Sequence, residues 1–256
     1  MNGFSFCVKD SISNKIIALE TVENTEALST PQLQLDFLKE QLESHVIFKN
    51  AFKKLVVLHS NALNSLVPKV LFKKDNIAEY LQFNVKLLTN EFVTHDPIEY
   101  TEIVNVYIPF VHLNNYLFDV FGSFDYKHTG TALIELLAPL QKHESKTKVF
   151  VHIEGKQFQM VVYKAGELEL HNSFSFNNKE DFVYYILFVF EQLNLNPDSV
   201  ALELLGDIEK DSELYELLFH YVRHVSFFEQ DLSALSSGIT INGHESPTLI
   251  HTVSCA

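Results

Sequence analysis

The residues with the strongest claim to phosphate chemistry lie in the stretch "VFVHIEGKQFQMVVYKAGELELHNSF", Val149 to Phe174. The stretch reads as three strands joined by two turns, and a first turn of this kind can hold phosphate through backbone amides. Such turns need glycine, because the backbone must approach the phosphate closely. The whole chain has only eight glycines, and the first turn contains one of them, Gly155. The chain therefore has few of the residues that a phosphate-binding turn requires.

A second pattern with chemical potential is the pair His220 and His224, which are four residues apart on an expected helix. This spacing can hold zinc. No glutamate follows His220 in the protease pattern HExxH, no third ligand is evident, and a chain with twelve histidines produces such pairs by chance. We therefore interpret the pair as surface residues. Cys7 and Cys255 lie at opposite ends of the chain and have no metal-ligand spacing, so no metal site is predicted.

The charge of the chain excludes several function classes. The net charge is −14, and Arg223 is the single arginine beside 18 lysines. Nucleic acids and anionic membranes are repelled by such a surface. A local lysine patch is conceivable, although we expect a solvated helix and strand edge there; its members are Lys53, Lys54, Lys69, Lys73 and Lys74.

Two classes of hydrolytic enzyme lack their motifs. A two-metal nuclease needs a cluster of carboxylates from one half of the chain, whereas Asp10 is in the first half and Glu154 is in the second. No GxSxG motif indicates a hydrolase either.

The composition predicts a folded protein of one large domain or two modest ones. Of the 256 residues, 46% are hydrophobic and 20% are charged, which is typical of a packed core. The longest apolar run, "FVYYILFVF", has nine residues, and a membrane-spanning helix needs about 20. The first residues show no signal-peptide pattern, and the two cysteines form no disulfide framework. We therefore expect a soluble protein in the reducing cytoplasm.

In the first half, the elements are predicted from hydrophobic periodicity and from capping residues. Strands are expected at 4–9, 15–22, 53–60, 66–72, 103–110 and 123–128, and helices at 31–45, 75–87, 112–122 and 129–141. Ser29 or Thr30 caps the first helix, and Pro31 occupies its first position. Asp75 is expected to cap the second helix, and Pro68 favours an edge strand.

The second half has a clearer pattern. Strands are expected at 148–154, 157–164, 167–176, 200–206 and 225–230, and helices at 179–194 and 213–222, capped by Asn178 and Ser212. The first of these helices is apolar on nearly every side, so it is either buried on more than one face or covers a partner. Residues 142–148, "KHESKTK", are the best linker, and residues 231–256 are weakly patterned. Both halves therefore open with antiparallel strands and continue with alternating helix and strand.

This order of elements resembles the actin-like ATPase superfamily, whose fold is a duplicated ribonuclease H-like domain with nucleotide in the cleft. The chain resembles in particular the bacterial family labelled domain of unknown function 3822, over essentially its full length. The resemblance implies an α/β, two-lobed fold with mixed five-stranded sheets. The first lobe would comprise residues 1–145 and the second residues 146–256, and we consider a C-terminal segment that crosses back onto the first lobe.

The superfamily has three nucleotide motifs, and the first and third are reduced here. In the first hairpin, "FCVKDSISNK", Asp10 is present without glycine, and Asp10 and Lys15 are the residues that would meet magnesium and phosphate. In the adenosine loop, relatives carry a pair of glycines. Here "LLGDIEKDSEL" keeps Gly206, and Asp207 follows it. A single glycine at this place is also an ordinary strand-to-helix turn.

The second motif has lost most of its chemistry. In "VHIEGKQFQM", His152 stands at the aspartate position, Glu154 at the first glycine position and Lys156 at the second. An imidazole is a poor magnesium ligand, and Glu154 brings negative charge to where phosphate would lie. Phe158 fills the place of a hydroxyl donor. Lys156 could compensate only as a point charge.

We therefore expect a non-catalytic binding or scaffolding module, without a cofactor, whose cleft or exposed strand edge takes a protein or peptide partner. The alternative is a weak ATPase or small-molecule kinase that uses Asp10, Lys15, Lys156 and Gly206. Aromatic side chains could line an interaction surface, although core packing is favoured for them; the candidates are Tyr184, Tyr185, Phe188, Phe227 and Phe228. No nucleic acid and no membrane insertion are expected.

Overall fold

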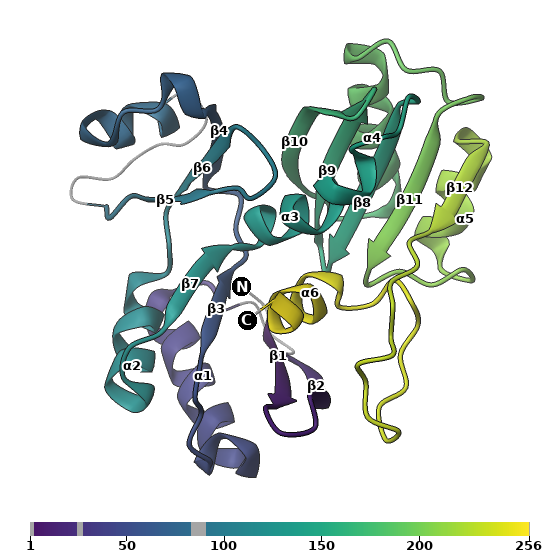
Figure 1. Ribbon diagram of the computed structural model, residues 1–256. Coiled ribbons are helices and arrows are strands. Elements are labelled where there is room, and N and C mark those ends of the chain that lie inside the picture. Colours follow the sequence, from purple (N-terminus) through teal and green to yellow (C-terminus); the bar gives the residue numbers. More distant parts are fainter. Residues whose placement is uncertain (1–2, 25–27, 83–90, 256) are drawn as a thin grey trace.

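The computed structural model describes residues 3–24, 28–82 and 91–255. Figure 1 shows a five-stranded sheet with its helices on the right, two smaller sheets on the left and a two-stranded hairpin at the lower centre. Two helices lie between them, α3 (Thr129–Gln141) and α6 (Pro247–Cys255). No helix in the described ranges has both the length and the apolar character needed to cross a membrane.

The five-stranded sheet is built from the second half of the chain and has the order β10-β9-β8-β11-β12. Its strands are β8 (Lys148–Glu154), β9 (Gln157–Lys164), β10 (Glu167–Ser175), β11 (Ala201–Gly206) and β12 (His224–Phe227). The hairpins β8-β9 and β9-β10 are antiparallel, whereas β8, β11 and β12 are parallel. The sheet is therefore mixed and five-stranded, as the resemblance implies.

Side chains along each strand point alternately to the two faces of this sheet, and a hydrophobic core lies on each face. Val149, Val151 and Ile153 of β8 belong to the core that faces α4 (Lys179–Gln192) and α5 (Glu213–Tyr221). Phe150, between them in sequence, packs on the other face with Leu133 and Leu137 of α3. Successive strand residues point to opposite faces, so a continuous apolar run indicates a sheet covered on both sides.

The N-terminus of α4 forms as its sequence predicts. The side-chain oxygen of Asn178 accepts a hydrogen bond from the Asp181 amide at 2.7 Å, and the Asp181 carboxylate accepts one from the Asn177 amide at 3.0 Å. These contacts satisfy amides that a helix start leaves without partners. Phe182 and Ile186 are then fully buried against the sheet.

In the described part of the first half, the strands form three small sheets in place of the five-stranded sheet that the resemblance implies. Their members are β1 (Gly3–Asp10) with β2 (Lys15–Glu23), β3 (Val56–His59) with β7 (Asp125–His128), and β4 (Asn64–Pro68) and β5 (Thr94–Pro97) on either side of β6 (Ile103–Tyr107). The pair β3-β7 is parallel, and the other pairs are antiparallel. The helices α1 (Pro31–Ser44) and α2 (Val111–Phe121) pack together through Leu38, Leu42, Leu113 and Leu117.

Several elements differ from the sequence predictions. The expected helix 75–87 is a 3₁₀ helix, η3 (Lys74–Leu81), preceded by Lys73 in the cap position; residues 83–87 of that prediction lie outside the described residues. The expected strand 66–72 ends at Pro68, which is followed by η2 (Lys69–Leu71). Another short 3₁₀ helix, η1 (Val46–Lys49), follows α1. Neither β5 nor α6 was predicted, because a four-residue strand and a helix in a polar segment leave little periodic signal.

The C-terminal segment returns to the N-terminal hairpin (Figure 1). The amide of Ile16 donates to the Ala234 carbonyl at 2.8 Å, and the Ser236 amide donates to the Ile16 carbonyl at 2.9 Å. Beyond this bridge, α6 packs against both α3 and β1. The division into lobes at 142–148 remains a prediction.

Candidate functional site

A small pocket forms where the loop after β3 meets the β8-β9 hairpin. Ser60 and Asn61 line it from the first half, and the residues from the second half are His152, Glu154, Gln157, Phe158, Gln159 and Ser173. The Ser60 hydroxyl donates a hydrogen bond to the Glu154 carboxylate at 2.5 Å and so joins the two halves. The pocket has a volume of about 10 Å³, which is about the space of one water molecule. In this conformation it has no room for a nucleotide.

The interior of this pocket has two polar atoms without a protein partner. Nδ1 of the buried His152 and the hydroxyl of Ser173 are both enclosed and make no hydrogen bond. Nε2 of His152 lies 3.9 Å from the nearer oxygen of Glu154. Buried polar groups are costly unless they are satisfied, and a polar cavity of this size can hold one ordered water. The size and the polar lining of the pocket therefore suit a single water molecule.

The turn of the β8-β9 hairpin is occupied by a carboxylate of the protein itself. The Gly155 amide donates to Oδ2 of Asp207 at 2.9 Å. Burial raises the pKa of the Asp207 carboxyl, the Gly155 amide lowers it, and the nearby Glu154 raises it further. The one glycine amide that this turn could offer to a phosphate is thus already bound to an anionic side chain.

Gly206, at the end of β11, is held in a comparable way. Its amide donates to the His244 carbonyl at 2.7 Å, and its φ angle is +84°, a conformation that glycine adopts readily. A Cβ atom at this position would lie 2.1 Å from the Ile153 carbonyl oxygen. The close approach of two chain segments therefore explains this glycine, and His244 takes the amide that an adenosine loop would present.

Of the predicted site residues, Asp10 and Lys15 lie opposite each other across the β1-β2 hairpin. Among the described residues, no hydrogen bond or ion pair links either of them to Lys156 or Gly206. The Asp10 carboxylate accepts hydrogen bonds from the amide and hydroxyl of Ser13, at 2.8 Å and 2.6 Å, and closes the β1-β2 turn. The Lys15 ammonium donates to the Ser233 carbonyl at 2.6 Å, and Lys156 is exposed in the β8-β9 turn. Asp10 and Lys15 therefore serve the hairpin and its contact with the C-terminal segment.

A buried polar network beside the pocket was missed by the sequence analysis. Asp96 on β5 accepts hydrogen bonds from the His128 amide and the Thr131 hydroxyl, both at 2.8 Å, and from the Tyr107 hydroxyl at 3.0 Å. Its carboxylate thus sits at the start of α3, where the helix dipole favours an anion. Burial raises the pKa of Asp96, and its three donors lower it. The sequence marks this site only by the dipeptide Asp96-Pro97, a pattern that usually indicates a turn.

The network continues across the junction between the halves. Nδ1 of His128 accepts from the Gly130 amide at 3.0 Å, so Nε2 carries the proton that it shares with the Asn61 carbonyl at 2.9 Å. On the far side, the Gln159 amide group donates to the Thr129 hydroxyl at 3.0 Å. The ring of His171 donates to Gln159 at 3.0 Å. These contacts fix α3 against β9 and β10.

Gly130 allows this arrangement, since a Cβ atom there would lie 2.8 Å from the His171 ring. The histidines of this region resist protonation; His59 and His128 are buried, and His171 is half-buried. Burial lowers the pKa of His128 to about 3, and it lowers those of His171 and His59 to about 4. Three neutral imidazoles therefore lie near the junction at physiological pH.

The aromatic candidates divide into two groups. Tyr184 and Phe188 on α4 are 61% and 43% exposed, and their rings stack 6.2 Å apart. Tyr185 and Phe227 pack at the edge of the core, and Phe228 is buried. The surface pair Tyr184–Phe188 is thus the part of this prediction that remains available to a partner.

The histidine pair does not share a helix. His220 is near the end of α5, which stops at Tyr221, and His224 begins β12. The spacing of four residues therefore does not place the two rings on one helical face, in agreement with their interpretation as surface residues.

Comparison with solved structures confirms the fold. A protein from Bacteroides thetaiotaomicron VPI-5482, described as having an actin-like ATPase fold and unknown function, superposes with a TM-score of 0.80 and 19% identity, over 100% of this chain and 93% of that chain. A structure described as the PilM-PilN type IV pilus biogenesis complex matches with a TM-score of 0.64 and 12% identity, over 98% of this chain and 94% of that chain.

No curated protein matches the chain. The family described as "Protein of unknown function (DUF3822)" matches residues 1–225. The resemblance drawn from the order of strands and helices is therefore confirmed by an independent comparison of the sequence. The chain belongs to this family, and it has the actin-like ATPase fold.

Proposed function

We propose that this protein is a binding or scaffolding module that works without nucleotide. The observation that carries the proposal is the hydrogen bond from the Gly155 amide to the Asp207 carboxylate. In a phosphate-binding turn, that amide would face an anionic oxygen of the ligand. Here the protein supplies the anion, so a nucleotide would have to displace an internal contact.

The charges around this turn support the same conclusion. Asp207 lies near Glu154, and Glu23 at the end of β2 also raises the pKa of Asp207. A triphosphate entering here would meet negative side chains in a partly desolvated place, where repulsion is stronger than in water. The aspartate that the superfamily resemblance expects to hold magnesium is His152 in this chain, and an imidazole is a poor magnesium ligand.

We further propose a protein or peptide partner and a cytoplasmic location. The matched PilM-PilN structure is a complex of a protein with this fold and another protein, which supports a partner-binding role. The exposed pair Tyr184–Phe188 offers a contact of the kind that interface cores favour. Both cysteines are free thiols, which fits a reducing compartment.

The alternative function, a weak ATPase or small-molecule kinase, remains defined by Asp10, Lys15, Lys156 and Gly206. It would require the Ser60–Glu154 hydrogen bond to open and Asp207 to leave the Gly155 amide. Lys156 is the member of the set that the structure leaves exposed beside the turn. Nucleotide binding in solution therefore separates the two functions.

We expect no rise in melting temperature when the protein is heated with millimolar MgATP. A ligand present at 100 times its dissociation constant stabilises a protein by about 2.7 kcal/mol, which corresponds to a shift of about 5–10 °C for a chain of this size. Differential scanning fluorimetry with MgATP, MgADP and MgGTP measures this directly. A shift of that size that is lost in the Lys156→Ala variant would establish the alternative.

Partner binding is expected to involve α4. A photo-crosslinking amino acid at Tyr184 should give a discrete covalent adduct in native cell extract. The same amino acid at Tyr100, an exposed residue in the first half of the chain, should give none. Phe188→Asp should abolish the adduct at Tyr184 because it places a charge in the apolar contact. Equal labelling from both positions, or none from either, would count against a partner on this face.

A further inference from the structure

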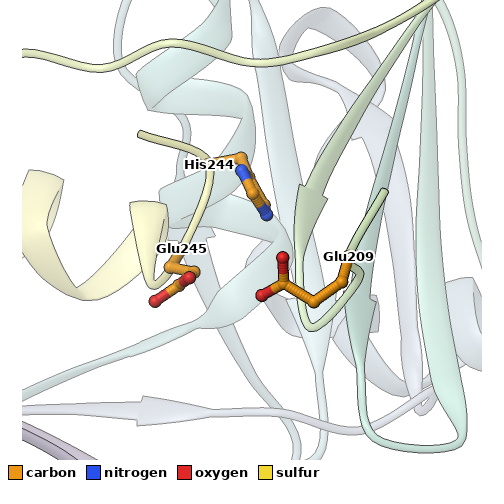
Figure 2. Close-up of side chains that lie close together, drawn as sticks. All are labelled: Glu209, His244 and Glu245. Atoms are coloured by element: carbon orange, nitrogen blue, oxygen red, sulfur yellow. The ribbon is translucent and has the colours of Figure 1, made fainter. Parts of the chain in front are cut away.

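Three side chains with metal-ligating atoms meet at the end of β11 (Figure 2). Glu209 comes from the loop after β11, and His244 and Glu245 come from the segment that leads into α6. Each offers one ligand atom, and these three atoms all lie within 4.8 Å of one another. The cluster is separate from the pocket at Ser60 and Glu154, and the sequence analysis did not identify it.

His244 has the environment of a metal-binding histidine. Its side chain is 6% exposed, and its ring lies against that of Phe227 with centroids 4.5 Å apart. Nε2 lies 2.8 Å from the Ile208 carbonyl oxygen. A carbonyl can only accept, so Nε2 carries the proton that it shares with Ile208. Figure 2 shows the outer end of the ring directed toward the gap between the two glutamates, so a metal bound there by Nε2 would take the place of this proton.

The carboxylates of Glu209 and Glu245 have no basic side chain paired with them among the described residues. One oxygen of Glu245 accepts a hydrogen bond from the Asn242 amide group at 2.7 Å, which orients it, and Glu209 is exposed. Among the residues that the structure describes, neither glutamate forms an ion pair. Two like charges beside a buried neutral ring favour a cation between them.

The backbone around the cluster is fixed on both sides. The His244 carbonyl accepts from the Gly206 amide at 2.7 Å, and the Glu245 carbonyl accepts from the Gln230 side chain at 2.7 Å. Zinc holds nitrogen and carboxylate ligands at about 2.0–2.2 Å, so the ligand atoms must approach one another by about 1 Å on binding. Glu209 can supply this movement, because its side chain is exposed and its carboxylate forms no ion pair with any residue that the structure describes.

We propose that Glu209, His244 and Glu245 form a binding site for a divalent transition-metal ion such as Zn²⁺. One imidazole and two carboxylates are a donor set that zinc accepts, and three protein ligands leave a coordination position open. The ion would link the loop after β11 to the segment before α6. It would thereby tie the C-terminal segment to the five-stranded sheet. The site needs no nucleotide and stands independently of the proposed function.

Isothermal titration of the purified protein with ZnCl₂ tests this site. We expect one Zn²⁺ per chain, with the affinity reduced at least about tenfold in both Glu209→Gln and Glu245→Gln. Asp211→Asn is the matched control, since it removes the same charge from an exposed position in the same loop and should leave the affinity unchanged. Circular dichroism of each variant confirms that the chain is folded.

Cobalt gives a second readout that does not depend on stability. Co²⁺ bound by an imidazole and carboxylates has visible absorption bands, and these should be lost in Glu209→Gln and kept in His220→Gln, which removes the exposed histidine on α5. No binding of Zn²⁺, or binding that the two glutamate variants leave unaltered, would overturn the proposal. Loss of binding in His220→Gln alone would also do so, because it would place the metal elsewhere.

Discussion

Replacing Asp96 with alanine is expected to lower the free energy of unfolding by about 3–5 kcal/mol. The reason is the number of donors that would lose their acceptor. The His128 amide, the Thr131 hydroxyl and the Tyr107 hydroxyl all point at this carboxylate, at 2.8, 2.8 and 3.0 Å. These three donors are buried, so solvent does not replace the carboxylate when Asp96 is removed. Each buried donor that is left without an acceptor costs about 1–3 kcal/mol.

Urea denaturation followed by circular dichroism measures this loss. The free energy of unfolding of Asp96→Asn should lie between those of the wild type and Asp96→Ala. The amide oxygen of asparagine can still accept a hydrogen bond, whereas its NH₂ group is a donor and would face other donors. Tyr107→Phe should cost about 1 kcal/mol, since it removes only one of the three hydrogen bonds. Asp119→Ala, at an exposed position on α2, is the control and should change stability by less than about 0.5 kcal/mol. If Asp96→Ala is no more destabilising than Asp119→Ala, the network does not support α3.

Acidification from pH 7 to pH 5 is expected to destabilise the protein strongly. In the folded state, burial holds the pKa of His128 at about 3 and those of His171 and His59 at about 4. The unfolded chain has histidine pKa values of about 6.5. Below pH 6.5 the unfolded state therefore binds more protons than the folded state, and the free energy of unfolding falls as the pH falls. Each of these histidines contributes a loss of about 2 kcal/mol by pH 5.

The opposite sign applies to two carboxylates. Burial raises the pKa values of Asp96 and Asp207 in the folded state, so their protonation on folding favours the folded state as the pH falls. Their effect sets in as the pH falls through the raised folded-state pKa and is complete below the ordinary aspartate pKa of about 4. The two carboxylates therefore offset part of the loss of stability that the three histidines cause as the pH falls.

The histidine variants separate this effect from ordinary destabilisation. His128→Gln keeps a donor for the Asn61 carbonyl but cannot be protonated, so the difference in stability between pH 7 and pH 5 should shrink by about 2 kcal/mol. His171→Gln should reduce the stability difference between pH 7 and pH 5 by a similar amount. His143→Gln, in the exposed loop before β8, should leave that difference unchanged. Urea titrations at both pH values give each difference even if a variant is less stable overall. An unchanged pH dependence in His128→Gln would show that this ring is not enclosed as the structure has it.

The second half of the chain was largely predictable because local signals there agree with the tertiary fold. The strands of the five-stranded sheet alternate between two covered faces, and Asn178 and Ser212 cap their helices as the sequence predicts. The order of elements was sufficient to identify the family and the fold, and the matches confirm both. The loss of phosphate-binding residues in the β8-β9 turn was also visible in the sequence alone.

The first half was less predictable because its elements are short and depend on distant contacts. The β5 strand is stabilised by pairing with β6 and by the role of Asp96 in the network, and neither is a local property. The helix expected from residue 75 begins as a 3₁₀ helix, where the ring of Phe72 stacks against Tyr80. Tertiary packing overrode the helical spacing there.

The sequence by itself determined the fold class, the order of elements in the second half and the absence of a glycine-rich phosphate loop. Only the tertiary structure decided which charged groups meet. Asp207 is 52 residues from Gly155, and Gly206 meets His244, which lies 38 residues further along the chain. Periodicity and capping report on neighbours within one element, whereas such contacts arise when β11, the hairpin and the C-terminal segment pack together. The same packing brings Glu209 to His244 and Glu245 and encloses Asp96 among its donors.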